Sequence, residues 1–96
     1  MKRSNEQSIK DALADMLRDY HIEEKVNESR LKERWEKMFG KTIMKYTQKI
    51  FVKDKKLFLT IDSASLKQEL LYSKQKMIER INAEIAHGMI EDIILK

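Results

Sequence analysis

Two sets of residues in this sequence have types that could carry chemistry, and neither set is complete. Gly40-Lys41-Thr42 has the order of the end of a phosphate-binding loop, but the required glycine five residues earlier is replaced by Trp35. A helix also precedes these residues where a strand is needed. His21 and His87 lie at the ends of expected helices, and neither has a second ligand at metal-binding spacing. A nucleotide-binding loop and a metal site are therefore not expected.

Nucleophilic and acid–base catalysis are also not expected. Ser63 and Ser65 have no histidine near them in the sequence to act as a base, and both are better explained as helix caps. The carboxylates of the N-terminal region fall on the solvated faces of helices and form no acid–base pair; they include Asp15, Asp19, Glu23 and Glu24. We therefore predict that the chain is not an enzyme, and that it needs no cofactor or small-molecule substrate.

The distribution of charge favours binding of an anionic partner. Residues 1–40 carry nine basic and nine acidic side chains, whereas residues 41–80 carry ten basic and four acidic. A basic central region is typical of a surface that faces phosphates, although a lysine-rich surface can also serve only solubility. The candidate nucleic-acid-binding residues are Lys41, Lys45, Lys49, Phe51, Lys53, Lys55, Lys56, Lys67 and Lys74.

The aromatic residues within this region sharpen that prediction. Strands are expected at 48–53 and 56–62, joined by a loop of two or four residues. This register places Phe51 opposite Phe58 among lysines on one face, and the opposite face is then apolar core. Aromatic rings between lysines on a sheet are typical of single-stranded nucleic-acid binding. Alternatively, an N-terminal helical hairpin covers this face and both rings belong to the core.

Helices are expected on both sides of these strands. A helix over 5–20, opened by a Ser4–Gln7 capping box, and a second over 23–38 form a helical hairpin with a break at His21-Ile22. Trp35 shares an apolar face of the second helix and is either a core anchor or a binding residue. Gly40 ends this helix in a left-handed conformation.

The C-terminal half completes the fold. One long helix is expected from Ser63 or Ser65 to about residue 86, followed by a buried strand over 90–95. The order is then ααββαβ, an α+β fold in which a three-stranded sheet packs against a long helix and the helical hairpin. Residues 1–96 are expected to form a single domain. With no cysteine and no apolar run long enough to span a bilayer, a cytoplasmic location without membrane contact is expected.

Across nearly its whole length the chain resembles the DciA family of bacterial replicative-helicase loaders, formerly a domain of unknown function. The resemblance is a pattern of separate positions rather than a catalytic motif, and these are Trp35, Gly40, Ile43, Tyr46-Thr47, Leu57, Leu59, Ser63, Leu66, Glu69-Leu70 and Ile93. It implies a KH-like domain that contacts the hexameric replicative helicase and has affinity for DNA. The Gly-x-x-Gly loop of true KH domains is missing, because Gly40 and Gly88 cannot form one.

The sequence thus predicts a DNA-replication accessory protein that binds the replicative helicase and single-stranded DNA. The outer face of the long helix offers a polar surface for the helicase, comprising Lys67, Lys74, Glu79 and Arg80. Two alternatives stay open: an adaptor that binds only protein, and a KH-like domain that binds RNA.

Overall fold

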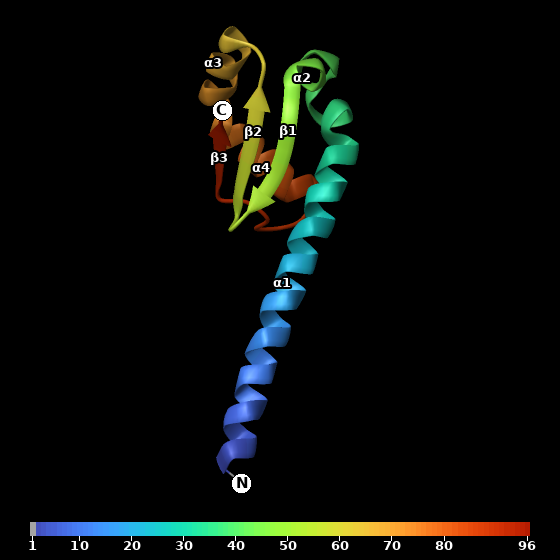
Figure 1. Ribbon diagram of the computed structural model, residues 1–96. Helices are drawn as coiled ribbons and strands as arrows, with labels where there is room; N and C mark the ends of the chain where they lie inside the picture. Colours follow the sequence, from blue (N-terminus) through green and yellow to red (C-terminus); the bar gives the residue numbers. More distant parts are fainter. Residues whose placement is uncertain (1) are drawn as a thin grey trace.

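A helix and a mixed sheet dominate the computed structural model, which describes residues 2–96, with side chains from Ser8 onward (Figure 1). The elements are α1 (Lys2–Phe39), α2 (Lys41–Tyr46), β1 (Thr47–Lys53), β2 (Lys56–Ile61), α3 (Ala64–Tyr72), α4 (Lys74–Glu84) and β3 (Asp92–Leu95). This arrangement confirms the predicted α+β fold with a three-stranded sheet. No helix in the described part of the chain is both long and apolar enough to cross a membrane.

The N-terminal region differs from the prediction, because α1 is one continuous helix and not a helical hairpin. No glycine or proline occurs before Gly40, so nothing interrupts the helix at His21-Ile22. The C-terminal part of α1, where buried residues begin at Asn27, packs on the sheet, and the longer N-terminal part projects away from the domain (Figure 1). The predicted Ser4–Gln7 capping box lies outside the residues whose side chains are described.

Gly40 ends α1, as predicted. Its N–H donates to the carbonyl oxygen of Glu36, and its backbone has φ 96° and ψ 167°, a conformation that essentially only glycine adopts. The chain turns there into the short helix α2.

The β1–β2 hairpin has the predicted register. Phe51 pairs with Phe58 and Val52 with Leu57 around the two-residue turn Asp54-Lys55. Both turn residues have positive φ, 52° and 61°, as in the type I′ turns that match the twist of a hairpin. The outer edge of β1 is held by α1, because the Val52 N–H donates to Glu28 Oε1 over 2.7 Å.

The C-terminal half differs from the prediction in one respect. The expected long helix is divided at Ser73 into α3 and α4, and the Ser73 N–H is shared between the carbonyl oxygens of Glu69 and Leu70. Ser63 caps α3 by accepting the Leu66 N–H on its hydroxyl. β3 then pairs parallel to β2, so the strand order is β1-β2-β3.

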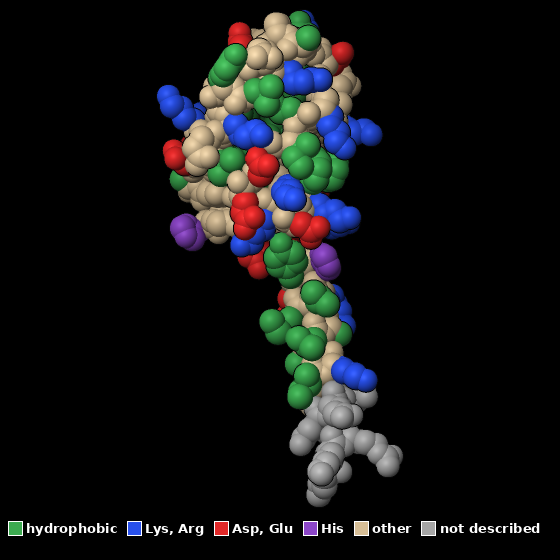
Figure 2. Space-filling view, turned by 90° about the vertical axis from the view of Figure 1, so that its left-hand side faces the viewer, with side chains coloured by type: hydrophobic (Ala, Val, Ile, Leu, Met, Phe, Trp, Pro, Cys, Tyr) green, Lys and Arg blue, Asp and Glu red, His purple; other side chains and the backbone are tan. Residues whose placement is uncertain are grey.

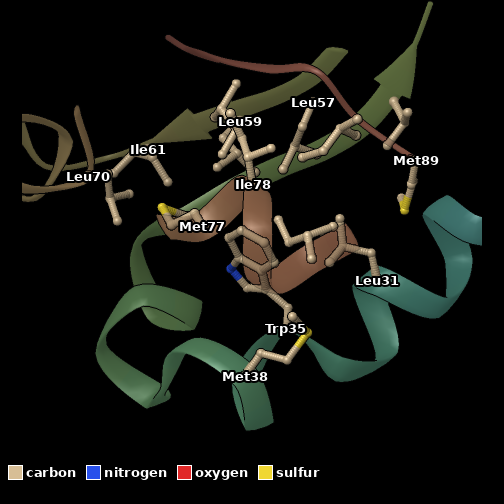
Figure 3. Packing of buried hydrophobic residues seen from close by; sticks show 14 of the residues in the cluster. Leu31, Trp35, Met38, Leu57, Leu59, Ile61, Leu70, Met77, Ile78 and Met89 are labelled. Carbon is tan, nitrogen blue, oxygen red and sulfur yellow. The ribbon is translucent and has the colours of Figure 1, made fainter. Parts of the chain in front are cut away.

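The core lies on one face of the sheet only. Trp35 and Leu31 from α1 meet Ile78 from α4 beneath Leu57 and Leu59 of β2 (Figure 3). Trp35 is fully buried, and its Nε1–H donates to Thr47 Oγ1 over 3.0 Å. Trp35 is therefore a core anchor, and the alternative of a binding residue is excluded.

Candidate nucleic-acid interface

The second face of the sheet has no helix over it (Figure 1). Because side chains alternate along a strand, this face carries every second residue of the three strands. We call it the open sheet face and define it as Lys49, Phe51 and Lys53 of β1, Lys56, Phe58 and Thr60 of β2, and Asp92 and Ile94 of β3. Its members are exposed or partly exposed, whereas their neighbours Val52, Leu57, Leu59 and Ile93 are buried.

Two stacked aromatic rings form the centre of the open sheet face. The ring centroids of Phe51 and Phe58 lie 4.6 Å apart and the ring planes are within 7° of parallel. The Phe51 side chain is 40% exposed, so a planar group in solvent can reach it. Lys96 extends this surface, with its Nζ 5.6 Å from the centroid of the Phe58 ring. The alternative in which a helical hairpin buries both rings is thus excluded.

Lysines surround the two rings. Lys53 and Lys56 pair across the hairpin next to Phe51 and Phe58, and Lys49 lies two residues before Phe51 on the same face. The acidic member of the open sheet face is Asp92, whose carboxylate lies 3.3 Å from Lys74 Nζ. The face therefore offers positive charge beside flat apolar rings.

Asp92 stays ionised at neutral pH and holds Lys74. The Ile93 N–H donates to its Oδ1 over 2.8 Å, and this hydrogen bond lowers the pKa of Asp92, with a further contribution from Lys74. Partial burial of the carboxyl opposes this shift. Lys74 is therefore engaged in an ion pair, which makes it less available to phosphates than Lys49, Lys53 or Lys56.

The other predicted DNA-binding lysines lie away from the two rings. Lys41 and Lys45 are exposed on α2, where Lys45 Nζ lies 5.7 Å from the ring centroid of Tyr46. Lys55 lies in the hairpin turn, and Lys67 is half-buried on α3. Of the nine predicted residues, the structure brings four together on the open sheet face: Lys49, Phe51, Lys53 and Lys56.

A hollow beside the open sheet face was not predicted from the sequence. It has a volume of about 490 Å³, lies between α1, α2 and the edge of β1, and is lined by Lys32, Met44, Thr47, Gln48, Lys49, Ile50 and Phe51. Phe51 thus belongs to the stacked pair and also lines the hollow. Lys32 and Met44 come from separate helices, so only the folded chain places them next to β1.

The four residues predicted to contact the helicase do not share one surface. Lys74 is drawn to Asp92 of β3, whereas the Arg80 guanidinium lies 5.5 Å from the ring centroid of Phe39 on α1 and 3.3 Å from Glu84. Lys67 lies on α3, beyond the division of the helix at Ser73. Glu79 is exposed on α4. A helicase contact through all four at once would need a broad partner surface.

Nothing in the described part of the chain suggests catalysis. Among the described residues, no three His, Cys, Asp or Glu side chains are placed to hold a metal ion. His21 lies on α1 beside Tyr20, with ring centroids 5.7 Å apart, and His87 lies in the loop after α4. Ser63 is occupied as the cap of α3. The geometry is that of a binding surface.

A protein-family model matches nearly the whole chain. The model described as "Dna[CI] antecedent, DciA" matches residues 8–95. The chain therefore belongs to the DciA family, which is a family of helicase loaders that act in DNA replication and are not themselves catalytic. The comparisons with curated proteins and with solved structures each gave no match.

Proposed function

We propose that this chain is a non-enzymatic helicase-loading factor that binds the replicative helicase and holds single-stranded DNA on the open sheet face. The observation that carries the DNA-binding part is the exposed Phe51–Phe58 stack bordered by Lys49, Lys53 and Lys56. Bases stack on aromatic rings, and lysines neutralise the phosphates between successive bases. The DciA family supports the helicase as partner.

The chemistry of the face suggests little sequence preference. Every base has a flat face that can stack on Phe51 or Phe58, whereas lysines contact phosphates, which are the same in every nucleotide. The long side chains of Lys49 and Lys53 can follow a flexible backbone. Such a surface suits a factor that must hold whatever sequence is exposed when a helicase is loaded.

Binding of single-stranded DNA is expected to weaken as salt rises. In a titration followed by fluorescence anisotropy, log affinity should fall with log salt by about 0.7 for each phosphate contact. The double variant Lys49→Gln with Lys53→Gln should make this slope shallower by roughly 1.4, because two contacts are lost. Lys10→Gln with Lys37→Gln is the matched control, since it removes the same charge from α1 and should leave the slope unchanged.

The same titration separates the proposal from its two alternatives. An adaptor that binds only protein would show no salt-dependent DNA binding, and this result would remove DNA from the function. A KH-like RNA-binding domain would prefer a single-stranded RNA of the same sequence to the DNA. Equal or tighter binding of the DNA supports the proposal.

The helicase contact is tested separately. Isothermal calorimetry with the purified replicative helicase of the same organism should show a complex with micromolar affinity, as expected for a transient interface of modest area. Lys67→Glu with Lys74→Glu should slow association without unfolding the domain, because charges at the rim of an interface mainly set the on-rate. No complex at tens of micromolar would contradict the helicase as partner, whatever the DNA titration shows.

A further inference from the structure

The projecting part of α1 carries a row of apolar side chains that this chain leaves exposed. Ile9, Leu13, Met16, Leu17 and Tyr20 are between 38% and 66% exposed. At about 100° per residue they fall within an arc of roughly 100° on the helix surface. We call this row the α1 stripe. Figure 2 shows apolar side chains following one side of the projecting helix.

The α1 stripe continues the side of the helix that forms the core. With the same helical geometry, Leu31, Trp35 and Met38 fall within the same arc, and all three are buried in the domain. One continuous apolar face therefore runs along α1; its C-terminal part is packed on the sheet and its N-terminal part is exposed. A helix face of this kind has to be buried against another element to be stable in water.

We infer that the α1 stripe is covered by the α1 stripe of a second copy of this chain, in an antiparallel pair of helices. Four of its members, Ile9, Leu13, Met16 and Tyr20, are spaced by four, three and four residues, which is the spacing of a coiled-coil seam. An antiparallel partner places Ile9 opposite Tyr20 and Leu13 opposite Met16. Each contact then occurs twice about a two-fold axis, so the row is complementary to itself.

The position of the domain favours this direction over a parallel pair. The sheet and α4 lie on the same side of α1 as the stripe, because both are packed against Leu31 and Trp35. In a parallel pair the two domains would both occupy the space between the helices. In an antiparallel pair the two domains lie at opposite ends of the paired helices. The N-terminal end of each α1 then reaches the surface of the other domain from which that domain's α1 projects.

The domain surface from which α1 projects carries acidic residues, which favour contact with the N-terminus of a helix. Where the projecting helix meets the domain, a hollow of about 230 Å³ is lined in part by Tyr20, by the carboxylates of Glu23 and Glu24, and by one lysine, Lys55. Acidic side chains lie there (Figure 2). Partial burial raises the pKa of Tyr20, and the nearby carboxylates of Glu24, Asp54 and Glu91 raise it further. Helix α1 begins at Lys2, and the N-terminus of a helix carries partial positive charge.

Sedimentation velocity over a range of protein concentrations tests the inference. The wild-type chain should change from monomer to dimer between a few and several hundred micromolar, since the paired surface is small. Leu13→Glu should abolish the dimer, because it places a carboxylate in the centre of the seam, and it should leave the fold intact because Leu13 is 53% exposed. Ile22→Glu is the matched control: Ile22 is 55% exposed on the opposite side of α1 and should still allow dimerisation.

The direction of the pair is tested by disulfide formation, since the chain has no cysteine of its own. A mixture of Ile9→Cys and Tyr20→Cys chains, one of them carrying a mass tag, should form the mixed disulfide between the two variants. Disulfides between identical variants would indicate a parallel pair and would overturn the antiparallel arrangement.

A wild-type chain that stays monomeric at several hundred micromolar would overturn the dimer altogether. If Leu13→Glu then also weakened binding to the helicase, the α1 stripe would belong to that partner. Dimerisation that survives Leu13→Glu would equally overturn the inference. These outcomes do not depend on DNA binding, so they are distinct from failure of the function proposed above.

Discussion

Replacement of Trp35 by alanine is expected to lower the free energy of unfolding by about 3–5 kcal/mol, the usual cost of removing a buried aromatic side chain. The side chain is fully buried, and it lies where α1, α4 and the sheet meet (Figure 3). A domain of this size is stable by only about 5–15 kcal/mol, so the loss is a large part of the total. Urea denaturation followed by circular dichroism measures it without the tryptophan signal.

Trp35→Phe separates the contribution of volume from that of the hydrogen bond. Phenylalanine retains much of the apolar ring but cannot donate to Thr47 Oγ1, which the indole reaches over 3.0 Å. A smaller loss than for Trp35→Ala is therefore expected. If the alanine variant unfolded at the same urea concentration as the wild type, the assignment of Trp35 as the core anchor would be wrong.

The sheet could be predicted from the sequence because its signals are local. Alternating apolar residues and a two-residue turn fix the register, and a shift of one residue would expose Leu57 and Leu59. Gly40 was correctly predicted to end α1, since few other residues adopt its backbone conformation. These features depend on residues that are near one another in the chain.

The two helix boundaries that were predicted wrongly have different causes. A break at His21-Ile22 has no glycine, proline or change of apolar face behind it, and helical geometry alone places residues before and after it on one side of α1. The division at Ser73 is the reverse error, since a break exists there that was not predicted, and the apolar face continues from Leu70 to Met77 across it. The Ser73 side chain makes no capping hydrogen bond to α4, so no residue in the pattern marks this division.

The wrong prediction of a break in α1 also explains why the exposure of Phe51 and Phe58 could not be predicted from the sequence. A helical hairpin would provide two helices, enough to cover both faces of a small sheet. One continuous helix covers a single face, and its remaining residues extend past the domain, so Phe51 and Phe58 stay in contact with solvent. The same continuity produces the uncovered α1 stripe. The residues of the site could be named from the sequence, whereas their exposure depended on how α1 folds.

The stacked rings of the open sheet face give the sharpest test of DNA binding. Phe51→Ala is expected to weaken binding of single-stranded DNA roughly five- to hundredfold, since loss of one base–aromatic stack costs about 1–3 kcal/mol. Phe51 is preferred to Phe58 because it is the more exposed ring, so its removal should disturb the fold less. Fluorescence anisotropy at low salt measures the change, and circular dichroism confirms that the variant is folded.

Two further variants distinguish stacking from general loss of apolar surface. Phe51→Tyr keeps an aromatic ring at the same place and should bind DNA nearly as well as the wild type. Leu71→Ala removes a similarly exposed apolar side chain from α3, away from the rings, and should leave DNA affinity unchanged. DNA binding by Phe51→Ala at wild-type strength would mean that the lysines act alone. In that case the open sheet face would hold DNA by charge, and the salt dependence expected for Lys49 and Lys53 would persist without any contribution from the stack.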